Sequence, residues 1–216
     1  MVLEQSNDQL VQKYIIHGQV DYSKLNHDES LESAVNAIKT HNLQFTDEKE
    51  EFAFYINTYN LLTLYSVKIE LAKNPDWKGN TSLFSKLRFF YLRRFQIGTK
   101  KMNLYALENK ILRKKFKDPR LHFAINCASK SCPFMPVNLL TGANLDEILD
   151  QSAKSFINDQ GGVIFQNGVL NLNRIFKWYK KDFVNGVIPF INSYWDGEPI
   201  PDTTEIKYLD YNWSLN

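Results

Sequence analysis

The chain has 216 residues, 44% of them hydrophobic and 23% charged, which is the composition of an ordinary globular protein with one hydrophobic core. Its net charge of +2 gives no support for a nucleic-acid partner. The longest uncharged run, residues 52–67, is short for a bilayer and contains polar side chains, so no transmembrane segment is expected. Residues 1–10 lack the basic start and apolar core of a signal peptide. The protein is therefore expected to be cytoplasmic, or periplasmic or otherwise exported after removal of a signal.

The first third of the chain is predicted to be mainly helical. A short helix and an extended piece are expected within residues 1–27. Asp28 is a suitable N-cap for a helix over residues 31–41, where apolar residues recur at helical spacing. A longer helix over residues 47–72 has acidic residues in its first turn and is apolar on nearly all sides. This pattern predicts a long, central, buried helix.

Asn57 and Asn60 lie on one face of this long helix. A buried amide without a partner costs about 1–3 kcal/mol, so both side chains need hydrogen-bonding partners. Two interpretations follow. The amides hold the backbone of loops in place, or they line a functional site and bind a substrate.

The next elements are two helices with a hairpin between them. Residues 83–94 are predicted to be helical, and their basic run, residues 86–94, is interpreted as a solvated helix face. A hairpin is expected over residues 95–102. Asn103 can cap the following helix, residues 104–116.

Glu108 lies on the apolar face of that second helix. A carboxylate in such a position needs a partner, because burying an unpaired charge is costly. Arg113 and Arg120 are the structural candidates for this partner, and His122 is the functional one.

The rest of the chain combines helices with β-structure. Residues 121–127 are predicted to form a strand, and the Asn-Gly turn within residues 163–172 predicts a hairpin. The remaining elements are helices over 145–158 and 173–183, a helix or strand over 187–194, and a final strand over 206–213. The pattern predicts an α+β fold in which residues 1–216 form a single, mostly helical domain. Its small antiparallel sheet would combine the strand 121–127, the hairpins and the tail.

The stretch LHFAINCASKSCP, residues 121–133, concentrates the residues that are capable of chemistry. It contains both cysteines, Cys127 and Cys132, together with His122 and Asn126. The predicted strand runs into a polar loop here, and loops at strand ends often carry functional residues. We therefore place the candidate site in this stretch.

The first hypothesis for this site is a thiol-dependent hydrolase or acyl transferase. Cys127 or Cys132 would be the nucleophile, His122 the base, and Glu108 or Asn126 the group that orients the imidazole. In a regular strand His122 and Asn126 share one face and Cys127 lies on the other, so the strand would have to end or bulge before Cys127.

The substrate of such a site would be an unknown small molecule or peptide. Asn57, Asn60, Asn126 and Ser131 are the candidates for contacting it. The sequence contains no P-loop, no G-x-G-x-x-G and no G-x-S-x-G motif, so no cofactor is predicted.

Three alternatives stay open from the residues alone. A disulfide between Cys127 and Cys132 would make the loop a rigid staple in a non-enzymatic binding module. A zinc site would use His122 with both cysteines, and Glu108 as a fourth ligand or as support for His122. In the simplest case, these residues are ordinary core cysteines and a hydrogen-bonded core histidine.

Several stretches together resemble the domain of unknown function 547, a family of bacteria and plants. They occur in the family's order, cover nearly the whole chain, and are most specific in the cysteine stretch and the tail. The stretches are GQVDYSKL at 18–25, FAFYINTYN at 52–60, LYALENKILR at 104–113, DPRLHFAINCASKSCP at 118–133, IFKWYKKDF at 175–183 and YLDYNWSLN at 208–216.

The resemblance implies a compact α+β fold, often exported in bacteria, but no agreed reaction. It also implies that a shared motif contains Glu108, His122, Cys127, Asn57 and Asn60. The tail departs from the family at one position, where this chain has Asn212 in place of the usual acidic residue. That departure puts any role resting on the carboxylate in doubt.

Overall fold

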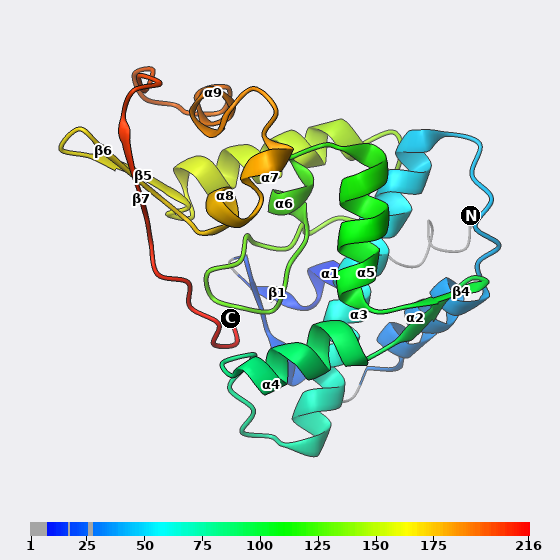
Figure 1. The fold of residues 1–216 in the computed structure, drawn as a ribbon. Helices are drawn as coiled ribbons and strands as arrows, with labels where there is room; N and C mark the ends of the chain where they lie inside the picture. Colours follow the sequence, from blue (N-terminus) through cyan, green and yellow to red (C-terminus); the bar gives the residue numbers. More distant parts are fainter. Residues whose placement is uncertain (1–7, 17, 26–27) are drawn as a thin grey trace.

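The computed structural model describes residues 8–16, 18–25 and 28–216 (Figure 1). The absence of a signal peptide was predicted from residues 1–10, and most of these, residues 1–7, lie outside the described residues. The fold is α+β and about 49% helical, as predicted. The helices are α1 (Asp8–Gln12), α2 (Glu29–Thr40), α3 (Glu48–Lys73), α4 (Leu83–Lys86), α5 (Leu104–Ala106), α6 (Leu121–Ala124), α7 (Leu145–Asn158), α8 (Ile175–Trp178) and α9 (Val187–Asn192). The 3₁₀-helical segments are η1 (Tyr22–Leu25) and η4 (Lys180–Asp182), and the π-helical segments are η2 (Leu87–Leu92) and η3 (Leu107–Phe116).

The long helix α3 is the central element, and α2, η1, α5 and η3 all contact it. Asp47 caps its start by accepting a hydrogen bond from the backbone N–H of Lys49 (3.3 Å). Nearly every side chain between Phe52 and Val67 is buried. The prediction of a long, central, buried helix is therefore confirmed, as is the Asp28 cap of α2.

Two of the helices change character part-way. η2 continues α4 and η3 continues α5, and both continuations are π-helical. The helices predicted over 83–94 and 104–116 are therefore present, with Asn103 capping the second through the N–H of Ala106 (2.7 Å). π-helical turns are rare and often occur at functional sites, and both of these contribute residues to the cavity described below.

Within residues 8–16, 18–25 and 28–216 the strands form three small sheets, where a single small antiparallel sheet was predicted. Both predicted hairpins are present, and the Asn-Gly turn of the second has positive φ at Asn167 and Gly168. The tail strand is shorter than predicted and pairs in parallel with β6. The strands are β1 (Ile15–Ile16), β2 (Gln19–Val20), β3 (Phe95–Ile97), β4 (Lys100–Met102), β5 (Val163–Gln166), β6 (Val169–Leu172) and β7 (Glu205–Tyr208).

The predicted strand over residues 121–127 is wrong, because its first half forms the helical turn α6. Asp118 and Pro119 begin this turn, and the Asp118 carboxylate accepts the backbone N–H of Arg120 (2.9 Å). An acceptor side chain followed by proline is a normal helix start. In the sequence this pair also marks the end of the preceding helix, which is the only role predicted for it. From Ile125 the backbone is extended.

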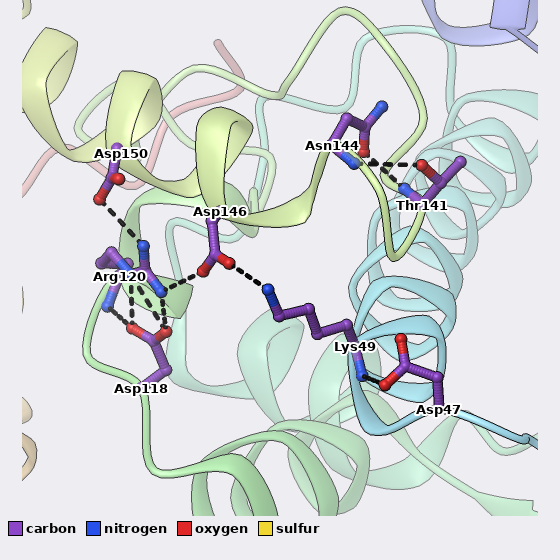
Figure 2. A network of polar contacts seen from close by, with 8 residues as sticks. All are labelled: Asp47, Lys49, Asp118, Arg120, Thr141, Asn144, Asp146 and Asp150. Atoms are coloured by element: carbon purple, nitrogen blue, oxygen red, sulfur yellow. Dashed lines mark hydrogen bonds and ion pairs between the residues drawn. The ribbon is translucent and has the colours of Figure 1, made fainter.

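Arg120 ties the start of α6 to α7 (Figure 2). Its guanidinium lies 2.6 Å from the Asp118 carboxylate, 2.8 Å from that of Asp146 and 2.9 Å from that of Asp150. Lys49 of α3 joins the network through Asp146 at 2.7 Å. Arg120 thus joins the start of α6 to α7, and the Lys49–Asp146 pair extends the network to α3.

We expect Arg120→Met to lower the free energy of unfolding by about 2 kcal/mol, because it breaks several charge-assisted hydrogen bonds at once. Urea unfolding at pH 7 measures this loss. Lys154→Met is the control: it removes an ion pair with Asp196 that is largely exposed, and should leave the free energy of unfolding nearly unchanged. Equal small losses in both variants would show that the Arg120 network does not stabilise the fold.

In the part of the chain that the structure describes, the buried apolar side chains form two clusters. One surrounds α3, and the other lies under β5, β6, α8 and α9. None of the helices in the described ranges combines the length and the apolarity that crossing a membrane requires.

Candidate functional site

A cavity of about 300 Å³ is lined by residues from both hydrophobic clusters. Most of its wall is aromatic, which suits a small-molecule site of modest size. All four residues predicted to be catalytic, Glu108, His122, Cys127 and Cys132, line it. They come from η3, α6 and the loop after α6, so the fold brings together side chains that the sequence places on separate elements.

The cysteine loop folds back on itself just after α6. Ala128 takes a left-handed conformation (φ +57°), and the N–H of Cys132 donates to the carbonyl of Ser129 (2.9 Å). This turn brings the Cys132 sulfur to 3.0 Å from the backbone nitrogen of Cys127. The two cysteines approach to 2.9 Å, but they are free thiols. The predicted disulfide staple is therefore wrong for this structure.

Asn126 and Ser131 hold this loop in shape. The Asn126 side chain donates to the carbonyl of Pro133 (2.7 Å) and accepts the N–H of Ala128 (2.8 Å). The Ser131 hydroxyl accepts the N–H of Asn212 (2.9 Å), which joins the loop to the tail. Both residues were predicted to contact a substrate, but their polar atoms are engaged with the protein backbone. The site depends on them for its geometry.

Asn57 and Asn60 have the same kind of role. The Asn60 amide donates to the carbonyl of Ala124 (2.8 Å) and accepts the N–H of Asn126 (2.9 Å). The side chain thus makes the pair of hydrogen bonds that a neighbouring strand would make in a sheet. Asn57 makes an equivalent pair of bonds with the backbone of Leu140 (2.7 and 3.0 Å). Of the two interpretations, the one in which these amides hold loop backbone matches the structure, and neither residue lines the large cavity.

Hydrogen-bonding groups converge on the sulfur of Cys127. The hydroxyl of Ser129 lies 3.1 Å away and that of Tyr211 lies 3.3 Å away. The hydrogen bond from Cys132 lowers the pKa of Cys127 most; burial opposes this effect, and Ser129 and Tyr211 add to it. Burial and the adjacent Cys127 raise the pKa of Cys132 well above its usual range. Of the two thiols, Cys127 is therefore the one that loses its proton first.

His122 is buried at 3% exposure and is held by Asp182, whose carboxylate lies 2.8 Å from Nε2. Burial alone would raise the pKa of Asp182, but hydrogen bonds from His122 and Arg113 lower it below its usual range. An ionised Asp182 requires a proton on Nε2, which leaves Nδ1 as the free position. Nδ1 is buried and has no partner among the described residues. No hydrogen bond joins His122 to either sulfur in the described chain, so the expected direct cysteine–histidine pair is not formed.

Two tyrosines supply the hydrogen bonds to Glu108. The hydroxyl of Tyr179 donates to one carboxylate oxygen (2.6 Å) and that of Tyr59 to the other (3.3 Å). The partners predicted for Glu108 are engaged elsewhere: Arg113 pairs with Asp182, Arg120 belongs to the network of Figure 2, and His122 also bonds Asp182. Tyr179 connects the two groups, because its ring stacks on His122 with centroids 4.0 Å apart.

Asp182→Asn is expected to destabilise the protein at pH 7 by about 1–2 kcal/mol, because Asp182 pairs with both Arg113 and His122. The folded-state pKa of Asp182 is lowered, so its contribution is complete above the unfolded pKa of about 3.9 and declines as the pH falls further. Urea unfolding at several pH values measures the difference in free energy of unfolding between wild type and Asp182→Asn. This difference should be constant above about pH 5 and should become smaller below about pH 4.

Asp210→Asn is the control, because Asp210 is fully exposed and should leave stability unchanged at every pH. If the loss of stability in Asp182→Asn became larger as the pH fell, the assignment of Asp182 as the ionised partner of Arg113 and His122 would be wrong.

The zinc hypothesis finds no geometric support. No group of three or more His, Cys, Asp or Glu side chains in the described chain is gathered as metal ligands would be. His122 and the two cysteines line the same cavity, but Nε2 of His122 is committed to Asp182.

Four residues that matter for the site were missed in the sequence: Ser129, Tyr179, Asp182 and Tyr211. Ser129 lies inside the cysteine stretch, two residues after Cys127, and this short spacing is a signal from which its role could be predicted. Tyr179 and Asp182 belong to the IFKWYKKDF stretch and Tyr211 to the tail stretch. The site groups to which these three hydrogen-bond lie 60 or more positions away in the sequence, and no local pattern links them.

A comparison with protein families matches the part of the chain that contains most of this site. A family model described as "Protein of unknown function, DUF547" matches residues 43–157, which contain Glu108, His122 and both cysteines. The chain belongs to the DUF547 family. Tyr179, Asp182 and Tyr211 lie beyond the matched range, so the DUF547 match covers the nucleophile candidates but not all of their partners. Comparison with curated proteins and with solved structures found no match.

Proposed function

We propose that this DUF547 protein is a thiol-dependent hydrolase or acyl transferase with Cys127 as its nucleophile. The observation that carries the proposal is the convergence of Cys132, Ser129 and Tyr211 on the Cys127 sulfur at the wall of a cavity. A thiolate, and not a thiol, attacks an acyl carbon, so a group of hydrogen bonds that lowers the pKa of Cys127 prepares it for this chemistry.

The reaction would proceed in two steps. The Cys127 sulfur bonds to the acyl carbon while the bond from that carbon to the leaving group breaks, and the leaving group departs with the electron pair. Water or an acceptor then attacks the thioester, Nδ1 of His122 takes the proton of the incoming nucleophile, and the sulfur–carbon bond breaks to restore the thiolate. The proton passes through solvent to the departed leaving group, so both side chains return to their starting states.

This scheme assigns separate roles to the buried groups. Asp182 fixes the imidazole so that Nδ1 is the unprotonated nitrogen. Glu108, held by Tyr59 and Tyr179, keeps the Tyr179 ring stacked on His122 and is a positioning residue in this scheme. His122 acts on the second nucleophile and not on Cys127, because no hydrogen bond joins the imidazole to the sulfur in the described chain.

The test is to trap the acyl intermediate. The purified protein is mixed with small thioesters of N-acetylcysteamine and with p-nitrophenyl esters of varied acyl length, and intact mass and peptide mapping locate the adduct. We expect one acyl group on Cys127 and none in Cys127→Ser. Hydrolysis of the adduct should be slowed in His122→Gln, which removes the free imidazole nitrogen. If no donor acylates Cys127 although iodoacetamide labels it rapidly, the thiol is reactive but the acyl-transfer function is wrong, and a binding module is favoured.

Lys86 indicates the charge of the acyl donor. It is the cationic residue among the described cavity-lining side chains, and its Nζ lies 3.9 Å from the centre of the Trp213 ring. No carboxylate pairs with it among the described residues, and burial lowers its pKa. An anionic group on the donor would supply the missing partner of this ammonium.

Two alkylating reagents of nearly equal size test this preference. Iodoacetate carries a carboxylate and iodoacetamide is neutral, so the ratio of their rates at Cys127 reports attraction of an anion independently of the thiol pKa. We expect Lys86→Met to lower this ratio several-fold, while Lys130→Met, a change at an exposed position of the cysteine loop, leaves it nearly unchanged. An unchanged ratio in Lys86→Met would reject an anionic donor and leave the thiol chemistry intact.

A further inference from the structure

The helix formed by α4 and η2 exposes a row of large apolar side chains. Leu83 is 84% exposed, Phe84 is 67% exposed and Leu92 is 60% exposed, and Leu87 and Tyr91 are also exposed. We call these five side chains the apolar face. Leu83, Phe84, Leu87 and Tyr91 recur at helical spacing, so they form a continuous stripe. In Figure 1 this helix lies in the lower part of the molecule, above the C-terminal end of α3.

The exposure is built into the fold, because the opposite side of the helix is firmly held. Phe89 is buried and stacks on Trp77, with ring centroids 5.9 Å apart. Arg88 and Arg93 both pair with the buried carboxylate of Glu70 on α3. The helix therefore cannot turn its apolar face inward without breaking these contacts. An amphipathic helix normally buries such a stripe, and one that displays it usually marks an interaction site.

The charge around the apolar face is strongly one-sided. Residues 77–107 contain Lys78, Lys86, Arg88, Arg93, Arg94, Lys100 and Lys101, and no Asp or Glu. The net charge of the whole chain is only +2, so the rest of the chain carries an excess of acidic residues. Arg94, Lys100 and Lys101 are exposed and form no ion pair among the described residues, and Arg94 bonds the carbonyl of Lys101 (2.9 Å). A basic group of side chains thus follows the apolar face at its C-terminal end, after Leu92.

We infer that the apolar face docks on the surface of a lipid bilayer that contains anionic headgroups. Its leucine and aromatic side chains would enter the boundary between headgroups and acyl chains, and the adjoining basic residues would contact lipid phosphates. A second copy of the chain is a poorer partner for this face. A symmetric contact through it would bring two basic segments together, which repel each other.

Docking would place the cavity at the membrane. Tyr91 belongs to the apolar face and also lines the cavity, where it stacks on Tyr105 with centroids 4.4 Å apart. Phe90, its neighbour on η2, lines the cavity too. If the proposed function is correct, the acyl donor would then be an anionic amphiphile taken from the bilayer. This consequence rests on the proposed function, whereas the docking itself does not.

Vesicle co-sedimentation tests the docking. The full chain is mixed with vesicles of phosphatidylcholine alone or of phosphatidylcholine with phosphatidylglycerol. We expect at least tenfold stronger binding to the anionic vesicles, weakened by added salt. The double variant Leu83→Ser, Phe84→Ser should lose at least tenfold in binding, and Arg94→Glu with Lys101→Glu should lose the preference for anionic lipid.

Val184→Ser is the matched control, because Val184 is 86% exposed but lies between η4 and α9, away from the apolar face. It should bind like wild type. Thermal unfolding verifies that each variant folds, and iodoacetamide labelling of Cys127 separates failure of docking from failure of the thiol site. Equal binding by wild type and the double variant would overturn the inference. So would equal binding to both vesicle types, or self-association that is lost in the double variant.

Discussion

Cys132→Ala is expected to slow the alkylation of Cys127 by iodoacetamide about tenfold at pH 7. The hydrogen bond from Cys132 is the largest effect lowering the pKa of Cys127, and bonds to a charged group contribute about 1.5–3 kcal/mol. A change of about 1.4 kcal/mol is tenfold in an equilibrium, so losing this bond should raise the pKa of Cys127 and lower its thiolate fraction about tenfold.

The pH dependence gives this prediction a second readout. Above both pKa values the two proteins are fully ionised, and a thiolate of higher pKa is intrinsically the better nucleophile. The variant should therefore react as fast as wild type, or faster, at high pH. Cys132→Ser is the control, since its hydroxyl can still donate to Cys127 and should retain most of the neutral-pH rate. A parallel loss of rate at all pH values in Cys132→Ala would indicate a change of shape or access instead.

The second large effect is expected for Asn60→Ala, which should lower the free energy of unfolding by about 2–4 kcal/mol. The substitution leaves the carbonyl of Ala124 and the N–H of Asn126 without partners in a buried region. Urea unfolding measures the loss. Because these two backbone groups flank Ile125 and lead directly into Cys127, the variant should also slow iodoacetamide labelling of Cys127 at pH 7.

Asn57→Ala is the matched control for that experiment. It removes an equivalent pair of bonds from the same helix, but its partner is Leu140, away from the cysteine loop. It should destabilise the protein by a similar amount and leave the labelling rate of Cys127 unchanged. If both variants altered labelling equally, general loosening of the fold would explain the effect, and the specific link from α3 to the loop would be wrong.

Helices and hairpins could be predicted from the sequence where the signal is local. α3 is apolar on nearly all sides, α2 has a cap and a clear 3.6-residue period, and Asn167-Gly168 allows few conformations other than a tight turn. The error at 121–127 has a local cause as well. Asp118-Pro119 both ends η3 and begins α6, and only the first function was recognised.

The site could be predicted only in part. Glu108 and His122 stand out because polar residues are unusual in apolar surroundings, and the cysteines stand out because the chain has only two, five positions apart. Asp182 and Tyr211 are ordinary polar residues in the sequence and acquire their roles only by folding, 60 and 84 positions from His122 and Cys127 respectively. Distance in the sequence also explains why the predicted partners of Glu108 are wrong. The predicted arginines lie near it in the sequence, whereas the tyrosines that bind it come from α3 and from the segment after α8.

The thiol site also differs from a conventional cysteine–histidine pair. No hydrogen bond to an imidazole stabilises the Cys127 thiolate in the described chain; three neutral donors, a thiol and two hydroxyls, surround it instead. Neutral donors lower a pKa less than an adjacent cation does. We therefore expect moderate activation, with the cavity and its aromatic wall supplying much of the selectivity for a substrate.

The most direct test of this account is the rate of alkylation of Cys127 by iodoacetamide in the wild-type protein, followed from pH 5 to pH 10 with peptide mapping to assign the label. We predict a single rise in rate with a midpoint clearly below the value of about 8.5 for an ordinary cysteine, and no labelling of Cys132 in the folded protein. A midpoint at or above 8.5, or faster labelling of Cys132 than of Cys127, would contradict the assignment of Cys127 as an activated nucleophile.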